Sequence, residues 1–292
     1  MNILITGSSG LIGTKLCSIL QQKGHRTVPL LRHQNAQPTS WDPENGIINI
    51  DGTFDVVIHL AGAGVASGRW SKSRKEGILN SRVQGTRLIA EYFSKLEKKP
   101  HLIVSSSAIG YYGNRGDELL DEDSSQGSGF LSDVCRQWED ATAKASEAGI
   151  RVVNLRIGVV LSTSGGALKK MLLPFRMCLG GKIGNGSQYF SWVSIQDIPG
   201  AIEFILTNDS IKGPVNLVSP APISNTDFTK ALGTALKRPT PVPLPAFMVK
   251  LLFGKMGDEC LLSGAQVMPG KLLDAGYTFE HPDIDQALDH LL

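Results

Sequence analysis

Long apolar runs are missing from this sequence, and so is a large excess of either charge. No apolar stretch reaches the roughly 18 residues that a membrane-spanning helix needs, and PAFMVKLLFG is interrupted by Lys250. The N-terminus MNILITG lacks the basic leader and cleavage site of a secretion signal. The net charge is only +2, and the one basic run, GRWSKSRK, is short. We therefore expect a globular protein with neither a membrane nor a nucleic acid as its partner.

Cysteine is also scarce, and its spacing excludes some chemistry. The four cysteines (Cys17, Cys135, Cys178 and Cys260) are far apart and include no C-x-x-C pair. This pattern indicates reduced thiols and gives no metal signature, so we predict no metal site. A reducing compartment follows, and we expect the cytoplasm.

Apolar runs typical of strands alternate with helical patterns over the first two thirds of the chain. The runs are NILIT, TVPLL, DVVIHLA, HLIVSSS, RVVNLR and PVNLVS. Such alternation predicts an α/β fold with a Rossmann-type, doubly wound parallel sheet. Glycine and proline become frequent after about residue 165. We therefore predict a dinucleotide-binding domain over 1–164, to which 190–218 returns, and a smaller C-terminal α/β lobe from 165–189 and 219–292. The apolar FMVKLLF in that lobe predicts either lobe core or the face of a homodimer.

The clearest motif is TGSSGLIG, which places Gly7, Gly10 and Gly13 between the first predicted strand and a helix. Glycines at these places permit a tight turn, close approach of the backbone to a pyrophosphate, and close packing of helix on strand. The G-x-x-G-x-x-G spacing is one residue longer than the usual dehydrogenase fingerprint. The alternative is a glycine-rich turn without a ligand.

Arg32 stands just after the second predicted strand, where an acidic residue would bind the adenosine ribose of NAD. A guanidinium can instead pair with the 2′-phosphate of NADP, so the residue favours NADP over NAD. A solvated arginine at a strand end is the alternative.

Four blocks in order resemble the extended short-chain dehydrogenase/reductases: TGSSGLIG, DVVIHLAG, LIVSSSAIGYYG and FSWVSIQDIPGAI. The C-terminal PVPLPAFMVKLLFG and AQVMPGKLLDAGYTFEHPDIDQAL look like the atypical "epimerase family protein" branch, which is similar to the nucleotide-sugar epimerases. The resemblance covers the whole chain and implies an NADP-binding protein related to oxidoreductases. The cofactor contacts that it implies are Gly7, Ser9, Gly10, Leu11, Ile12, Gly13, Arg32, Leu60, Ala61, Glu76, Arg82, Gly158 and Val160. Among these, Arg82 would give the phosphates a second cation, while Glu76 is also explained as a solvated helix charge.

The catalytic residues of that superfamily are only partly present. A Tyr transfers the proton, a Lys four residues later lowers the pKa of the Tyr and holds the nicotinamide ribose, and a Ser binds the substrate oxygen. Ser107 matches the Ser, but Leu131 occupies the Tyr position and Cys135 the Lys position. Tyr111 and Tyr112 are the remaining candidates for a proton donor, or they pack as loop aromatics. Cys135 is either redox-active or inert packing.

The resemblance places four further residues on the substrate side: Arg176, Lys182, Gln188 and Trp192. A cationic, glycine-rich loop suits a phosphorylated or acidic substrate, whereas a hinge with solvated charges would look the same. Two functions remain open. One is an NADP-dependent oxidoreductase or epimerase-like enzyme acting on a small polar carbonyl or sugar-like substrate. The other is a non-catalytic NADP-binding regulator that acts through a partner protein.

Overall fold

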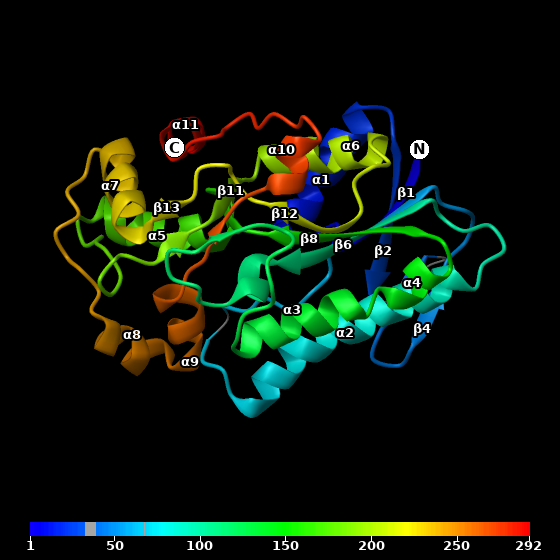
Figure 1. The fold of residues 1–292 in the computed structure, drawn as a ribbon, viewed down its shortest axis with the longest axis horizontal. Helices are drawn as coiled ribbons and strands as arrows, with labels where there is room; N and C mark the ends of the chain where they lie inside the picture. The colour runs from blue at the N-terminus through cyan, green and yellow to red at the C-terminus, as the bar shows by residue number, and fades with distance from the viewer. Residues whose placement is uncertain (33–38, 67) are drawn as a thin grey trace.

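The computed structural model describes residues 1–32, 39–66 and 68–292, and it contains one eight-stranded sheet (Figure 1). The strand order is β12-β8-β6-β5-β1-β2-β3-β4, and all neighbouring pairs are parallel except β3 and β4. The strands are β1 (Asn2–Thr6), β2 (Arg26–Arg32), β3 (Ser40–Asp42), β4 (Ile47–Asn49), β5 (Val56–His59), β6 (Leu102–Ala108), β8 (Arg151–Ile157) and β12 (Gly213–Leu217). The prediction of a Rossmann-type α/β fold is confirmed, and every predicted strand is present.

The point where the chain reverses direction across the sheet lies between β1 and β5. From β1 the chain builds outward through β2 to β4, and then it returns to the other side of β1 to form β5. Ligands of open α/β sheets bind at the carboxyl edge beside such a reversal. The short strands β3 and β4 were not predicted, because three residues are too few to show an alternating pattern.

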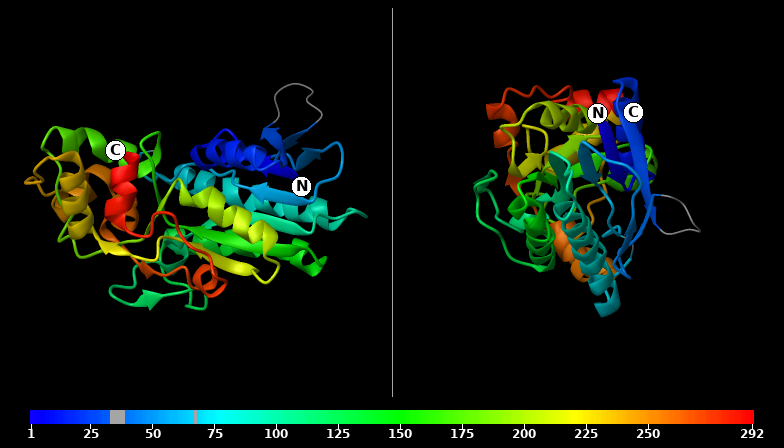
Figure 2. Two further views of the ribbon diagram at one scale, coloured as in Figure 1. Left: turned by 90° about the horizontal axis from the view of Figure 1, so that it is seen from above. Right: turned by 90° about the vertical axis from the view of Figure 1, so that its right-hand side faces the viewer.

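Helices cover both faces of the sheet (Figures 1 and 2). On one face, α1 (Leu11–Gln22) and α6 (Asp197–Thr207) share a buried cluster with Ile3, Ile5, Val56 and Ile58. On the other, α2 (Lys72–Ser94) and α4 (Ala143–Glu147) pack on Leu4, Val57 and Ile103. Helix α3 (Phe130–Asp140) lies beside α2, where the Trp138 indole N–H donates to Thr86 Oγ1 at 2.9 Å. Successive strand residues point to opposite faces of the sheet, so the apolar residues of one strand contribute to the hydrophobic clusters on both faces.

A second hydrophobic cluster lies at the carboxyl end of the sheet domain. It is formed mainly by α5 (Gly166–Arg176), α7 (Asn225–Leu236) and α11 (Ile284–Leu291). The remaining short elements are η1 (Ile109–Tyr112), β7 (Leu119–Leu120), β9 (Val159–Leu161), β10 (Tyr189–Phe190), β11 (Trp192–Ser194), β13 (Ile223–Ser224), α8 (Ala246–Phe253), α9 (Lys255–Gly257), η2 (Asp258–Leu262), β14 (Gln266–Val267) and α10 (Gly270–Asp274). Leu272 and Phe279 pack into the main core, so part of 219–292 contacts the sheet domain and not only the lobe.

Helix α8 contains the apolar FMVKLLF. It buries Val249 completely but leaves Phe247 and Leu251 69% and 70% exposed. Most of this segment is therefore not lobe core, and the homodimer stays a prediction. Across the residues that the structure describes, no helix is long and apolar enough to cross a membrane.

Candidate functional site

The glycine-rich turn joins β1 to α1 at the carboxyl edge of the sheet. Gly7 has a φ of +68°, and a Cβ there would lie 2.9 Å from the backbone of Leu60 and Ala61. A Cβ on Gly13 would lie 2.1 Å from the carbonyl oxygen of Gly7, so only glycine fits at either position. No side chain caps the N-terminus of α1. Its first backbone N–H groups are therefore available to an anionic group such as a pyrophosphate.

Thr6 and His59 hold the neighbouring strand end in place. Thr6 Oγ1 accepts hydrogen bonds from the N–H groups of Leu60 and Ala61, both at 3.2 Å, and lies 2.7 Å from His59 Nδ1. Burial lowers the pKa of His59 to about 4. His59 is consequently a neutral structural residue at the pH of a cell and does not serve as an acid or base.

The remaining predicted contacts near the turn lie close together. Leu11, Ile12, Leu60 and Val160 are half-buried and pack on one hydrophobic cluster, although they come from three separate parts of the chain. The Gly158 N–H donates to Leu217, which places the residues following β8 at the same edge. Ser9 and Gly10 are exposed beside them. These residues together form a surface suited to an extended dinucleotide.

Arg32 is the last residue of β2 and is exposed. It follows the part of β2 that pairs with β1, where Thr6 lies opposite Leu30. Its side chain is therefore at the outer end of the turn, where the 2′-substituent of an adenosine would lie. Glu76 is exposed on α2. Among the contacts described, it has no hydrogen bond that would position it, so the solvated-charge alternative stands for Glu76.

Arg82 lies on the α2–α3 face of the sheet, whereas α1 covers the opposite face. Its Nη1 donates to the carbonyl oxygens of Ala63 at 2.9 Å and Ile78 at 3.1 Å. The guanidinium carbon is 4.9 Å from the ring centre of Trp138 in α3. The guanidinium also lies beside Gly62, the residue after Ala61, and the backbone of Ala61 approaches Gly7. The role of Arg82 as a second cation for the phosphates stays a prediction.

Ser107 belongs to a buried network that joins β6, α3 and β8. Its hydroxyl donates to Glu139 Oε1 at 2.6 Å, and Arg156 holds both carboxylate oxygens of Glu139 at 2.9 Å. Burial alone would lower the pKa of Arg156. The hydrogen bonds and charge of Glu139 outweigh that effect, and the pKa is raised above its ordinary value. Arg156 is therefore charged, and its hold on Glu139 fixes the direction of the Ser107 hydroxyl.

The same network includes Tyr112, whose side chain is completely buried. The Tyr112 hydroxyl accepts from Arg156 Nη1 at 2.9 Å and lies 2.7 Å from Asn216 Oδ1 and 2.8 Å from the Asp121 carbonyl. Burial raises the pKa of Tyr112 to about 12. A phenol in this setting is a structural hydrogen-bonding group, so the geometry does not favour Tyr112 as the proton donor.

Tyr111 has a different environment from its neighbour. It is half-buried, and the Arg156 guanidinium carbon is 3.5 Å from its ring centre. This cation–π contact holds the ring at the end of β6, beside Ser107. Tyr111 is thus the remaining phenol near the predicted reaction site with an accessible side chain.

Helix α3 confirms the helical pattern of GFLSDVCRQWED, but its side chains do not supply acid–base chemistry. Cys135 is buried, and desolvation followed by the charge of Glu139 raises the pKa of its thiol to about 12. Such a thiol is inert packing and not a redox-active group. Sequence analysis did not identify Glu259, whose carboxylate accepts from the N–H groups of Phe130 at 3.3 Å and Leu131 at 2.9 Å. The C-terminal segment therefore caps the N-terminus of α3.

The four predicted substrate residues do not form one group. Trp192 is completely buried within the lobe core, which does not favour it as a substrate contact, and that assignment stays a prediction. The Gln188 amide donates to the carbonyl oxygens of Ile183 at 3.1 Å and Leu261 at 2.8 Å, and so it braces the loop. Arg176 and Lys182 are exposed and stay candidates. Sequence order alone could not distinguish these cases, because it does not show which side chains point inward.

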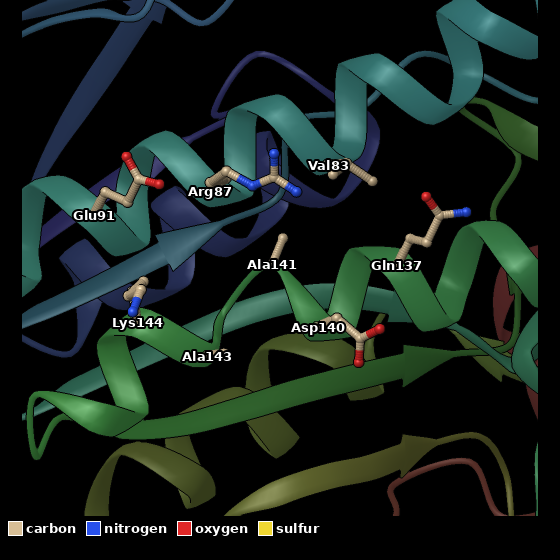
Figure 3. Close-up of a pocket in the computed structure, with 8 residues that line it drawn as sticks. All are labelled: Val83, Arg87, Glu91, Gln137, Asp140, Ala141, Ala143 and Lys144. Atoms are coloured by element: carbon tan, nitrogen blue, oxygen red, sulfur yellow. The ribbon is translucent and has the colours of Figure 1, made fainter.

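A surface pocket of about 300 Å³ lies between α2, α3 and α4 (Figure 3). Arg87, Glu91, Gln137, Asp140 and Lys144 project around it. Its lining combines both charges and includes none of the residues of the glycine-rich turn. This pocket is therefore separate from the predicted dinucleotide site.

Comparison with known proteins identifies the family. The NAD dependent epimerase/dehydratase family matches residues 3–217, and a domain of unknown function, DUF1731, matches residues 244–291. Epimerase family protein ML0860 of Mycobacterium leprae is 39% identical over 292 residues, which are 99% of this chain and 94% of that protein. Human epimerase family protein SDR39U1 is 33% identical over 297 residues and is covered completely.

Solved structures support the same assignment. The crystal structure of human SDR39U1 (isoform 2) with NADPH superposes with a TM-score of 0.92 and 32% identity, covering 100% of this chain and 99% of that one. A UDP-galactose 4-epimerase superposes with a TM-score of 0.72 and 18% identity, over 100% of this chain and 97% of that one, which shows a shared fold. The predicted resemblance is confirmed: the chain belongs to the NAD dependent epimerase/dehydratase family, among the epimerase family proteins similar to SDR39U1.

Proposed function

We propose that this protein binds NADP(H) at the carboxyl edge of its sheet and reduces a small polar carbonyl or sugar-like compound. Support for the cofactor comes from the turn that only glycine at positions 7 and 13 permits, from the uncapped α1, and from Arg32 at the end of β2. The NADPH in the structure of the human relative agrees with this choice. Gly7 to Gly13 would hold the pyrophosphate, and Arg32 the 2′-phosphate.

Replacing Arg32 by alanine should remove the preference for NADP over NAD. The forked charge-assisted contact to the 2′-phosphate would be lost, so NADPH affinity should fall by about tenfold or more while NADH affinity changes little. Calorimetric titration of both cofactors into both proteins measures this. Two results would show that Arg32 does not bind the 2′-phosphate. One is equal affinity of the unchanged protein for NADH and NADPH, and the other is an Arg32→Ala variant that still prefers NADPH.

The observation that supports catalysis is the position of Tyr111 over Arg156, 3.5 Å from guanidinium carbon to ring centre. When bound, NADPH supplies a hydride to a carbonyl carbon. The Tyr111 hydroxyl would give its proton to the carbonyl oxygen. Ser107 would orient that oxygen only after its hydroxyl turned away from Glu139, to which it donates in this structure. Carbonyl compounds that accept a hydride readily need the least assistance from a proton donor. We therefore expect such compounds to be the preferred substrates of this site.

A non-catalytic NADP(H)-binding regulator is the second candidate. The Ser107 hydroxyl is already bonded to Glu139 and the Tyr112 hydroxyl to the network around Arg156, so two of the three predicted catalytic groups have structural roles. Leu131 and Cys135 offer no replacement for the missing dyad. In this alternative the bound cofactor would be recognised by a partner protein.

Turnover assays separate the two candidates. We expect the purified protein to oxidise NADPH slowly with members of a panel of quinones, dicarbonyls and keto sugars, followed by the loss of NADPH absorbance. NADPH oxidation is also followed in two control reactions, one without protein and one with the Arg32→Ala variant. Tight NADPH binding without turnover on any compound would contradict the enzyme and favour the regulator.

A further inference from the structure

Helix α8 of the C-terminal lobe leaves many large apolar side chains in solvent. Phe247, Met248, Leu251 and Leu252 are between 39% and 70% exposed, and Val249 is the one buried residue of this helix. A helix of this length gains its stability mainly from packing, and α8 has little of it. Runs of exposed apolar residues are unfavourable unless they serve a function, and on soluble proteins such patches mark sites of interaction.

A second group of exposed apolar residues lies at the end of α5 and just after it. Leu173 and Met177 are 67% and 60% exposed, and Leu179 is 55% exposed. Among the residues that the structure describes, most of the large exposed apolar side chains fall within 173–179 and 242–252, and the others are scattered along the chain. Scattered exposed residues need no explanation, whereas their concentration in one lobe does.

The two groups form one surface, which we call the lobe face. The Val242 N–H donates to the Gly180 carbonyl at 3.2 Å, and the Leu244 N–H donates to the Lys182 carbonyl at 2.9 Å. The segment that enters α8 therefore lies alongside the segment that leaves α5. Val242 is itself 46% exposed and so extends the apolar surface between the helices. Figure 1 shows both helices on the left, at the lobe end of the molecule.

The charged residues around the lobe face are mainly cationic. Helices α5 and α8 and the two paired segments between them contain no acidic residue. Lys169, Arg176 and Lys255 are exposed and form no ion pair with another described residue. Lys250 lies 3.7 Å from Asp258, but both side chains are largely exposed, so solvent screens this pair. Such a surface is complementary to an acidic partner.

This charge distribution does not favour a second copy of the chain on the lobe face. A symmetric dimer brings the same surface of both subunits together, so cations would face cations across the contact. Like charges placed opposite each other at an interface are strongly unfavourable. The occupant is therefore expected to be a different molecule that carries negative charge.

The spacing of the apolar residues favours a helix as that occupant. On α5, Leu173 and Met177 are four residues apart and lie on one side of the helix. On α8, Phe247 and Leu251 have the same spacing. Rows of side chains one turn apart leave grooves into which the ridges of another helix pack. A bilayer surface has no such ridges, and flexible methionine side chains such as that of Met177 adapt readily to a peptide partner.

From these observations we propose that the lobe face binds an acidic amphipathic helix of a partner protein. The apolar residues of that helix would pack on α5 and α8, and its carboxylates would face the surrounding cations. This interaction goes beyond the proposed function and does not require that NADP(H) binds.

Two synthetic helical peptides test the proposal on the full-length protein. Both have leucine repeating every three and four residues; the remaining positions are glutamate and alanine in one peptide, and lysine and alanine in the other. We expect the glutamate peptide to bind at least about tenfold more tightly than the lysine peptide, as measured by fluorescence anisotropy. Added salt should weaken binding of the glutamate peptide, because it screens the attraction between the opposite charges.

Variants of the lobe face locate the binding site. Leu251→Ser should weaken binding of the glutamate peptide by about tenfold or more, whereas Leu119→Ser, at a 61% exposed position outside the lobe face, should have no effect. Lys169→Gln combined with Lys255→Gln should weaken binding by about threefold or more and reduce its dependence on salt. Lys144→Gln is the matched charge control, because Lys144 is 63% exposed on α4. Circular dichroism checks that each variant is folded.

Two further measurements test the other occupants. We expect Leu251→Ser to leave both the sedimentation of the protein at increasing concentration and its cosedimentation with phosphatidylglycerol vesicles unchanged. A dimer that Leu251→Ser dissociates would show that a second copy covers the lobe face, and vesicle binding that it abolishes would show that a membrane does. Either result would overturn the proposal. So would a glutamate peptide that binds no more tightly than the lysine peptide, or one that binds the folded Leu251→Ser variant with undiminished affinity.

Discussion

Glu139→Ala is expected to lower the free energy of unfolding by about 3–5 kcal/mol, the cost of removing one partner of a buried ion pair. The Arg156 side chain is only 3% exposed and that of Glu139 12% exposed, and their two 2.9 Å hydrogen bonds form a forked pair. Without Glu139, Arg156 would remain buried without an ion pair among the residues that the structure describes. Ser107 would lose its acceptor as well. Denaturant unfolding followed by circular dichroism measures the difference.

Asp140→Ala is the matched control for this prediction. Asp140 is the next residue of α3 and pairs with Arg136 at 2.9 Å, but its side chain is 62% exposed. Solvent screening makes such a surface pair worth about 0–1 kcal/mol, so Asp140→Ala should change stability little. Replacing Glu139 by leucine together with Arg156 by methionine should recover part of the loss, because no buried charge is then unpaired. A Glu139→Ala variant as stable as the Asp140→Ala variant would contradict the role assigned to the network.

Tyr111→Phe is expected to lower the rate of NADPH oxidation by about 100-fold or more, the usual contribution of a positioned general acid. Phenylalanine keeps the ring on Arg156 and removes only the hydroxyl, so the fold and the cofactor affinity should be unchanged. Turnover with the best acceptor of the panel and NADPH titration by calorimetry measure the two quantities on the same protein.

Tyr112→Phe provides the comparison, because it removes the neighbouring hydroxyl. That hydroxyl is buried and bonded to Arg156, so its loss should reduce stability by about 1–3 kcal/mol and leave turnover of the folded protein nearly unchanged. Loss of turnover in Tyr112→Phe with full activity in Tyr111→Phe would reverse the assignment. Full activity in both variants would show that neither phenol supplies the proton.

Local sequence patterns were sufficient for most of the fold. Six apolar runs became six strands of the sheet. Strands β1, β5, β6 and β8 are buried on both faces and so need an almost uninterrupted apolar sequence, which is visible without its neighbours. The helix predicted at TGSSGLIG is present and begins at Leu11, inside the motif. Strands β3 and β4 were missed because their formation depends on the pairing of β3 with β2 and of β4 with β3, and not on a local pattern.

The site was predictable only in part. Gly7, Gly13 and Arg32 lie where the motif and the strand end predict them, because backbone geometry and strand ends follow directly from the motif. Trp192 is buried where an accessible side chain was expected, because the chain position of a residue does not show whether its side chain points into a core. Glu259 was missed because it lies 128 residues from its partner Leu131, and a helix cap over that separation has no sequence signal.

By itself, the sequence determined the class of fold and the dinucleotide-binding turn, and it predicts the loss of the usual proton-transferring pair, since each depends on residues close together in the chain. Only the tertiary structure decided how the remaining polar groups are used. It buried Tyr112 and Cys135, engaged Ser107 with Glu139, left Tyr111 accessible over Arg156, and placed Arg82 on the face opposite α1. The physical reason is that burial and charge pairing depend on neighbours that are distant in sequence, and these two effects set the protonation and reactivity of each group.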